Sequence, residues 1–144
     1  MKKILVPTDF SIQADYSLHV AAQLAKKHNC EIYLLHMLEL PMNQVDALNS
    51  RSELPEALFY LKLAQKRFKS LTNKPFLKKI KINEIVKFHQ AFDGIMDTCK
   101  ELKIDLIVMG SHGVSGFREM FIGSNTEKVV RMSDIPVLVI KNYH

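Results

Sequence analysis

A short segment near the carboxyl end of the sequence, residues 109–125, contains four of the five glycines in the chain. It reads MGSHGVSGFREMFIGSN, and its outer glycines are spaced Gly110-x2-Gly113-x9-Gly123-Ser124. Glycine costs conformational entropy, so a cluster marks tight turns or a backbone that a ligand must approach closely. Backbone N–H groups at the start of a helix bind anions without any side-chain charge. The spacing therefore favours a site for the phosphate groups of a ligand.

Three better-known glycine motifs do not fit this segment. A P-loop requires a Gly-Lys pair, and the sequence has none. A dinucleotide-binding fingerprint follows the first strand, but here the first apolar run ends in Pro7-Thr8-Asp9. Ser115 is followed by Gly116 and Phe117, so it lacks the closing glycine of a nucleophile elbow. Phosphate binding by the main chain and a glycine-rich turn that binds nothing are the two interpretations left open.

The elements that would position this segment alternate between short apolar runs and helical patterns. The expected strands cover residues 2–6, 31–38, 77–89, 105–110 and 136–141. The expected helices cover residues 11–28, 55–71, 91–102 and 124–133, with Ser11 and Ser124 as amino-terminal caps. The last two strands are continuous apolar runs, as in a parallel sheet covered by helices on both faces. We therefore predict an α/β fold, a single doubly wound domain spanning residues 1–144 with a five-stranded parallel sheet.

Doubly wound folds bind their ligands beyond the carboxyl ends of the strands, where the strand order reverses. In this chain the residues at those positions are Thr8 and Asp9, then Met37 to Glu39, then Gly110 onward. The glycine cluster thus falls where the fold class places a ligand.

The same segments resemble the universal stress protein family. The resemblance rests on VPTDFS and LLHMLE at the ends of the first two expected strands, and on VMGSHG, GSNTEKVV and PVLVIK. It covers essentially the whole chain, and the spacing G-x2-G-x9-G-[S/T] is typical of the ATP-binding branch of that family. The resemblance implies a sheet in the order 3-2-1-4-5 and ATP as the ligand, with any Mg²⁺ carried by the triphosphate.

The resemblance also implies roles for individual residues. Asp9 would hold the ribose hydroxyls, a role that suits a carboxylate because it accepts several hydrogen bonds; a cap on the first helix is the alternative. Met37 would meet the adenine edge through its main chain, with Pro7 and Val6 lining the base. The residues expected to contact ribose and phosphates are Met109, Gly110, Gly113, Gly123, Ser124 and Asn125. Asn125 departs from the apolar residue that relatives often carry there.

The sequence is compatible with three functions. An ATP-binding regulatory module of the stress response is favoured over a slow ATPase or other phosphoryl-transfer enzyme, because the loop contains no acidic residue except Glu119 and no lysine in a motif. A nucleotide-free scaffold that binds a partner is the third. His112 and Arg118 are each either ligand contacts or solvated loop residues. His36, within an expected strand, is interpreted as a hydrogen-bonded core residue.

The bulk composition excludes several classes of protein. The 47% of hydrophobic residues suits a globular domain, and Cys30 and Cys99 form no CxxC motif that would indicate a metal or redox site. The start of the chain lacks the apolar stretch of a secretory signal, and no apolar run is long enough to span a membrane. We therefore expect a soluble, cytoplasmic protein.

The net charge of +5 is concentrated in residues 57–83, which contain eight Lys or Arg and no Asp or Glu. Nucleic acids and anionic membranes are possible partners for such a segment. A solvated helix face is favoured instead, because no aromatic residues interleave with the basic ones on that face.

The last expected strand would lie at an edge of the sheet in the order 3-2-1-4-5. Its residues Val137, Leu138, Val139 and Ile140 are apolar, and an unprotected apolar edge invites another strand. We expect a homodimer, or pairing with a sister domain, through this strand.

Overall fold

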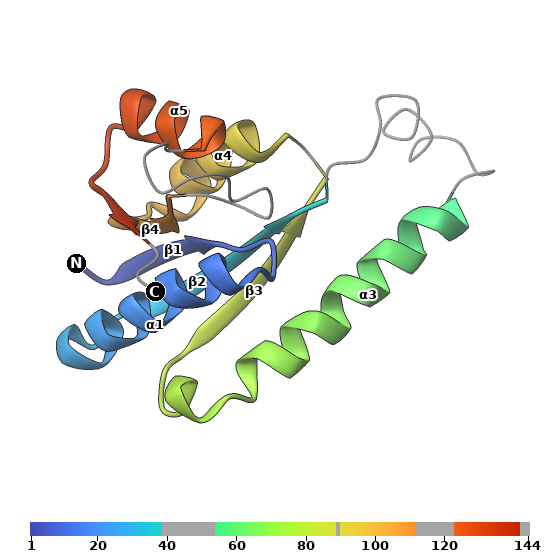
Figure 1. Cartoon of the computed structure of the whole chain (residues 1–144), viewed down its shortest axis with the longest axis horizontal. Coiled ribbons are helices and arrows are strands. Elements are labelled where there is room, and N and C mark those ends of the chain that lie inside the picture. Colours follow the sequence, from blue (N-terminus) through green and yellow to red (C-terminus); the bar gives the residue numbers. More distant parts are fainter. Residues whose placement is uncertain (39–53, 89, 112–122, 142–144) are drawn as a thin grey trace.

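Five strands form one parallel sheet in the order β3-β2-β1-β4-β5 in a computed structural model of the chain (Figure 1). The structure describes residues 1–38, 54–88, 90–111 and 123–141, and the side chains of residues 54 and 55 are not included. The strands are β1 (Lys3–Pro7), β2 (Glu31–Met37), β3 (Ile82–Lys87), β4 (Leu106–Gly110) and β5 (Val137–Ile140). The helices are α1 (Ile12–His28), α3 (Leu54–Thr72), α4 (Ala91–Leu102) and α5 (Ser124–Met132), with a short 3₁₀ turn, η2 (Pro75–Leu77).

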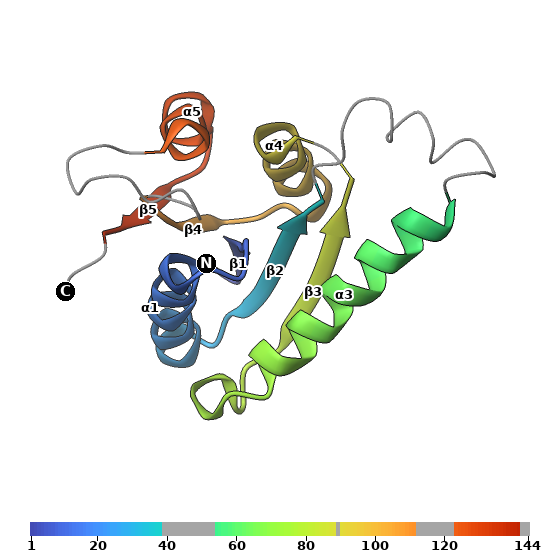
Figure 2. The ribbon, with the colours of Figure 1, turned by 45° about the vertical axis from the view of Figure 1, so that its right-hand side comes forward.

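Helices cover both faces of the sheet, as predicted. Figure 2 shows α1 and α3 on one face and α4 and α5 on the other. Alternate residues of β1 divide between the two faces, because Ile4 and Val6 pack toward α1 while Leu5 packs toward α4 and α5. All three side chains are completely buried, which explains why this strand reads as a continuous apolar run.

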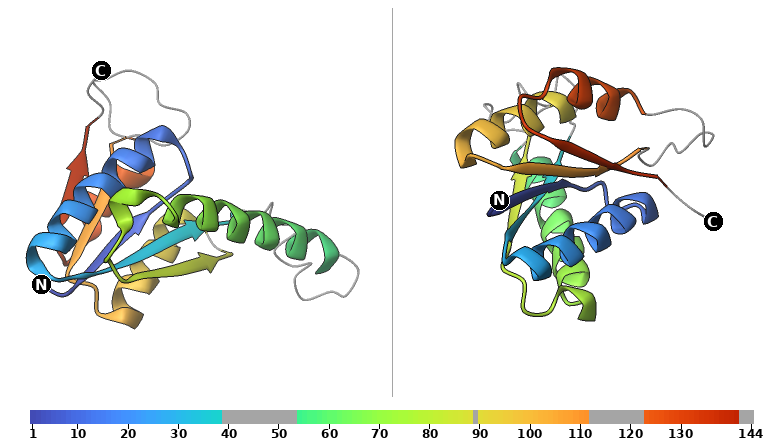
Figure 3. Two further views of the ribbon diagram at one scale, coloured as in Figure 1. Left: turned by 90° about the horizontal axis from the view of Figure 1, so that it is seen from below. Right: turned by 90° about the vertical axis from the view of Figure 1, so that its left-hand side faces the viewer.

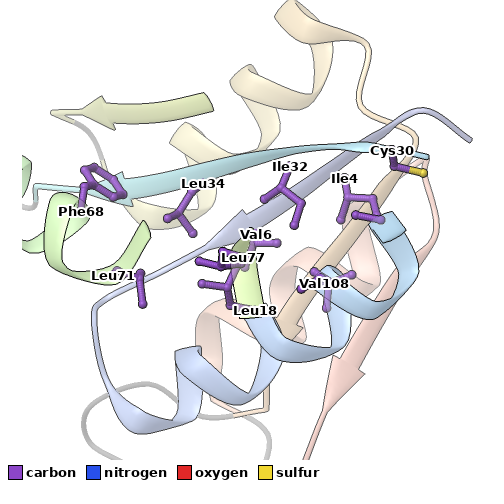
Figure 4. Packing of buried hydrophobic residues seen from close by; sticks show 13 residues of the cluster. Ile4, Val6, Leu18, Cys30, Ile32, Leu34, Phe68, Leu71, Leu77 and Val108 are labelled. Carbon is purple, nitrogen blue, oxygen red and sulfur yellow. The ribbon is translucent and has the colours of Figure 1, made fainter. Parts of the chain in front are cut away.

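The larger core lies between the sheet and the pair formed by α1 and α3 (Figure 4). Phe68 of α3 is 1% exposed, and it is among the largest side chains that are fully buried there. The buried positions of α3 recur at helical spacing along one stripe, from Ala57 through Ala64 and Phe68 to Leu71. The amino-terminal part of α3 extends beyond the ends of β2 and β3 (Figure 3), which leaves Phe59 and Tyr60 exposed to solvent.

These exposed rings correct one sequence-based expectation. Phe59 lies three and seven residues before Lys62 and Lys66, so an aromatic side chain does share a face with the basic residues of this helix. The expectation that no aromatic residue accompanies them is wrong at this end of α3. The rings at 59 and 60 also contact each other edge to face, with 5.6 Å between their centroids.

Two element boundaries differ from the prediction. The strand expected over residues 77–89 begins only at Ile82, because Pro75 starts the η2 turn, Leu77 is buried in the core, and Lys79 has a left-handed backbone with φ 68°. Ser124 was expected to cap the last helix, but it is the first helical residue and Gly123 occupies the cap position. The cap of α1 is Ser11 as predicted, since its Oγ accepts a hydrogen bond from the N–H of Ala14 at 3.1 Å.

One buried phenylalanine of α3, Phe68, and one exposed phenylalanine, Phe59, together provide a test of this core. We expect Phe68→Ala to lower the free energy of unfolding by about 3–5 kcal/mol, because it leaves a cavity under the helix. Phe59→Ala is the matched control, and its effect should stay within about 0.5 kcal/mol because that ring is 62% exposed. Urea denaturation followed by circular dichroism measures both values. Equal losses for the two variants would contradict the packing described here.

Candidate functional site

The turn between β1 and α1 carries the predicted residues Pro7 and Asp9. Pro7 is the last residue of β1, opposite Leu35 of β2. The next residue, Thr8, is buried, and its N–H donates to the carbonyl of Leu35 at 2.8 Å. The carboxylate of Asp9 accepts the N–H of Ser11 at 2.9 Å. Asp9 therefore shapes the turn that leads into α1, whereas Ser11 is the residue that caps the helix.

Phe10, directly after Asp9, adopts a left-handed backbone conformation with φ 62°. A bulky L-residue is rarely found there, because its side chain crowds the backbone. The conformation is held by a hydrogen bond from its N–H to Oγ1 of Thr8 at 3.0 Å. Its ring contacts His36 at 4.6 Å between centroids and Phe68 at 5.1 Å. Strained residues of this kind cluster at functional sites, where the surroundings maintain them.

Met37 is the last residue of β2, and its side chain lies against α4. A Cβ atom added at Gly94 would lie 2.2 Å from Cε and 2.3 Å from Sδ of Met37, so the thioether fills the space that a side chain at 94 would need. The ladder between β1 and β2 stops at Leu35, whose carbonyl faces β1. Because main-chain groups alternate along a strand, those of Met37 face the same side, beyond the end of β1. Its main chain, rather than its side chain, therefore faces the edge of the sheet beyond β1.

The end of β4 and the start of α5 are bound directly to each other. The N–H of Gly123 donates to the carbonyl of Ser111 at 2.6 Å, and Oγ1 of Thr126 donates to the carbonyl of Gly110 at 2.9 Å. The N–H of Ser111 donates to Ile140 of β5 at 2.9 Å. These bonds bring the two ends of the glycine-rich segment together. Gly113, His112 and Arg118 lie outside the described residues.

The cap residue of α5 is Gly123, which has no side chain and so makes no side-chain cap bond to the first turn of the helix. The first N–H groups of a helix have no partner within the helix and carry a partial positive charge. Ser124 and Asn125 are both exposed at this end. The side chain of Met109, in contrast, is buried in the core between the sheet and α5, so only its main chain could meet a ligand.

The sheet order brings these parts to one edge. β1 lies between β2 and β4, so Asp9, the main chain of Met37, and the start of α5 all follow the carboxyl ends of three adjacent strands. The carboxylate of Asp9 and the N–H groups at the start of α5 thus lie at the same edge of the sheet. A carboxylate can accept hydroxyl groups, and helix N–H groups can bind an anion. The arrangement suits a ligand with hydroxyl groups in one part and phosphate in another.

The side chain of His36, in β2, contacts the turn between β1 and α1. The sequence did not indicate this contact. Its Nδ1 lies 2.8 Å from the carbonyl oxygen of Thr8. The prediction of a hydrogen-bonded core residue is confirmed in that the ring is partly buried and bonded. Burial lowers the pKa of His36, as does the nearby Arg67, while the carbonyl of Thr8 and the charge of Asp9 act in the opposite direction.

Other catalytic or metal chemistry finds little support in the part of the chain that the structure describes. There, no group of three or more His, Cys, Asp or Glu side chains is placed to hold a metal ion. Burial raises the pKa of the Cys99 thiol to about 11, so this thiol is protonated at neutral pH and is a poor nucleophile. Within the same residues, no helix has the length and apolar character needed to cross a membrane.

The lowered pKa of His36 predicts a dependence of stability on pH. The unfolded chain binds a proton at this imidazole near pH 6.5, whereas the folded protein binds it only at lower pH. Between these two values the unfolded state holds more protons, so acidification destabilises the fold. We expect the urea midpoint to fall as the pH is lowered through about 6.5.

The variant His36→Asn keeps an N–H donor toward Thr8 but does not titrate. Its urea midpoint should therefore depend less on pH over this range than that of the parent. Identical pH profiles for the two proteins would show that His36 does not contribute.

Comparisons with known proteins agree with this fold. A model of the universal stress protein family matches residues 1–141. The universal stress protein MJ0577 of Methanocaldococcus jannaschii is 34% identical, in an alignment that covers 97% of this chain and 94% of the relative. A solved structure of MJ0577 superposes with a TM-score of 0.81 at 27% identity, covering 99% of this chain and 97% of that one.

Two solved structures of other family members contain nucleotides. One is a universal stress protein in complex with cAMP, with a TM-score of 0.62, 22% identity, and coverage of 96% of this chain and 95% of its own. The other is a universal stress protein from Archaeoglobus fulgidus in complex with dAMP, also with a TM-score of 0.62 and 22% identity, covering 98% of both chains. At this level of identity the two structures establish a shared fold.

Proposed function

Because the chain belongs to the universal stress protein family, we propose that it is an ATP-binding regulatory module of the stress response. The observation that carries the proposal is the pair of hydrogen bonds that joins the start of α5, where the cap residue Gly123 offers no side chain, to the end of β4, at the same sheet edge as the Asp9 turn. Occupancy of this site by ATP would set the conformation or the partner of the protein. The site would belong to one domain formed by residues 1–144.

In this proposal the ribose hydroxyls of ATP bind Asp9, and the adenine edge meets the main chain of Met37 beside Pro7. The phosphates bind the main chain from Met109 and Gly110 to the start of α5. The groups at the phosphate end are the backbone of Gly113 and Gly123 together with Ser124 and Asn125. The N–H groups at a helix terminus supply the positive partial charge that a triphosphate requires.

A divalent cation would enter with the triphosphate. Glu127 is the acidic residue of the first turn of α5, and its carboxylate is paired with Arg131. Asp9 would be engaged at the ribose end. The described residues thus fit a nucleotide whose own phosphate oxygens hold Mg²⁺, with no dedicated carboxylate ligand from this part of the protein.

The alternative of a slow ATPase is less well supported. Phosphoryl transfer needs a group that orients the attacking water and cations that neutralise the developing charge. At the described start of α5 the candidates are the hydroxyl of Ser124 and the amide of Asn125, and neither is a base at neutral pH. We therefore propose binding with little or no turnover.

The relatives in complex with cAMP and dAMP support an adenine nucleotide as the class of ligand. They do not distinguish ATP from a monophosphate. The preference for a triphosphate rests on the glycine spacing of residues 110–124 and on the helix terminus.

Titration calorimetry with ATP and AMP tests this function. We expect the parent protein to bind ATP more tightly than AMP, and we expect Gly113→Val to remove measurable ATP binding because its β-branched side chain blocks the approach to the backbone. Asp9→Ala should weaken ATP binding by about 10–100-fold, since it removes charge-assisted hydrogen bonds. Asp97→Ala, at an exposed position of α4, is the matched control and should bind normally.

Three results would each overturn the proposal. The first is a parent protein that binds neither nucleotide, and the second is a Gly113→Val variant that binds ATP like the parent. The third is steady release of phosphate at about 1 per second or faster, within the ordinary range of enzymes.

We also propose that β5 pairs with a second copy of the chain or with a sister domain. β5 is an edge strand, and Leu138 is 38% exposed on it. On α5, which packs against β5 on the opposite face from Leu138, Val130 and Met132 are 47% and 59% exposed, so apolar side chains are also exposed on that face. Val137 packs on the α5 side of the sheet and Ile140 on the α1 side, in agreement with alternation along the strand.

Light scattering at micromolar concentration should show a dimer. Val139→Lys should weaken it by about tenfold or more, because an unpaired charge would be buried in the interface. Phe59→Lys, on the exposed part of α3, is the control and should leave the dimer intact. A monomeric parent, or a dimer indifferent to both Val139→Lys and Leu138→Lys, would exclude β5 as the interface.

A further inference from the structure

We propose that His36 is a positioning residue for the nucleotide: it holds the turn that presents Asp9 to the ribose hydroxyls. The inference rests on the proposed function, because it concerns how that site selects its ligand. His36 itself would not touch the ligand. It would act through Thr8 and Phe10, the two neighbours of Asp9 in the chain.

The contact with Thr8 fixes one side of the turn. Nδ1 of His36 lies 2.8 Å from the carbonyl oxygen of Thr8, and a carbonyl can only accept, so the imidazole donates from Nδ1. The N–H of Thr8 is bonded to Leu35 of the same strand, β2. Both main-chain groups of Thr8 are therefore held by consecutive residues of β2. Asp9 follows immediately, so its Cα position depends on these two bonds.

The contact with Phe10 fixes the other side. The rings of His36 and Phe10 are 4.6 Å apart, and Phe68 closes on Phe10 from α3 at 5.1 Å. Arg67 of α3 lies over the Phe10 ring at 5.8 Å. The left-handed backbone of Phe10 is costly for a residue of this size, and it persists only where the surroundings hold it. Without the ring of His36, Phe10 would lose one wall of its pocket.

The orientation of Asp9 depends on both contacts. One oxygen of its carboxylate accepts the N–H of Ser11, the residue after Phe10. This bond orients the carboxylate that the proposed function assigns to the ribose diol. A change in the backbone of Phe10 would rotate the Ser11 N–H and the carboxylate with it. Selection of the ribose hydroxyls should therefore be sensitive to His36.

The experiment compares ATP with 2′,3′-dideoxy-ATP, which lacks both ribose hydroxyls. The ratio of the two dissociation constants isolates the contribution of Asp9 from that of the phosphate site. In the parent protein we expect a ratio of about 10–100, the size of hydrogen bonds to a charged group. The variants are His36→Phe, which keeps an aromatic ring without a donor, and His36→Asn, which keeps an N–H donor in the place of Nδ1.

We expect His36→Phe to lower this ratio several-fold and to leave the affinity for 2′,3′-dideoxy-ATP unchanged. His36→Asn keeps the donor but lacks the ring that contacts Phe10, so it should restore part of the ratio. In an Asp9→Ala background, His36→Phe should have no further effect on the ratio. His19→Asn is the matched control and should behave as the parent, because the ring of His19, in α1, stacks on Phe76 of η2 rather than on Phe10. Melting temperatures confirm that each variant is folded.

The outcomes separate this inference from the proposed function. A parent that binds neither nucleotide overturns the proposed function and this inference with it. A parent that binds ATP and discriminates, together with a His36→Phe variant that discriminates equally well, overturns the inference alone. Equal loss of affinity for both nucleotides in His36→Phe also overturns it, because that result indicates a general structural role.

Discussion

The parallel pairing of β1 with both β2 and β4 is the constraint on which the rest of this structure depends. Ile4 lies opposite Ile32 on one side and Leu106 on the other, so β1 is the centre of the sheet. Parallel strands place their carboxyl ends at the same edge, and the chain must leave each strand there. The β1–α1 turn, the end of β2 and the end of β4 consequently lie at the same edge of the sheet. Folds of this class bind their ligands at this edge, so the topology alone favours it as the place of the proposed site.

The residues around that edge must both pack in the core and leave groups that a ligand can contact. The strands are buried on both faces, and their side chains are committed to the core, as Met109 and the Met37 thioether illustrate. The contacts open to a ligand are therefore mainly main-chain groups and a few side chains in turns. Phe10 shows the cost of this arrangement, since a left-handed conformation is imposed on a large residue and is maintained by its neighbours from β2 and α3. The contacts that pack the core under α1 and α3 thus also shape the turn between β1 and α1.

The segment in which the basic residues are concentrated, residues 57–83, does not coincide with the proposed phosphate site. The basic residues of α3 and the following turn are distant in sequence from the glycine-rich segment. Two of them are paired with acidic residues of other elements: Lys74 with Asp15 at 2.8 Å, in a partly buried pair, and Lys81 with Glu31 at 3.2 Å, in an exposed pair. Exposed pairs add little to stability. The proposed phosphate site relies instead on helix N–H groups, which supply positive partial charge without a lysine. The net charge of the chain is therefore a poor guide to where it would bind an anion.

The sequence by itself determined the elements, their alternation and the parallel sheet, because continuous apolar runs and helical spacing are local properties of the chain. It also indicated the positions of Asp9, Met37 and the glycine spacing, since these follow the ends of strands. The order β3-β2-β1-β4-β5 came from resemblance, and the structure agrees with it. Only the tertiary structure decided that Gly123 rather than Ser124 caps α5, that Phe10 is left-handed, and that His36 bonds to Thr8. Each of these depends on contacts between residues distant in sequence, and local patterns carry no record of such contacts.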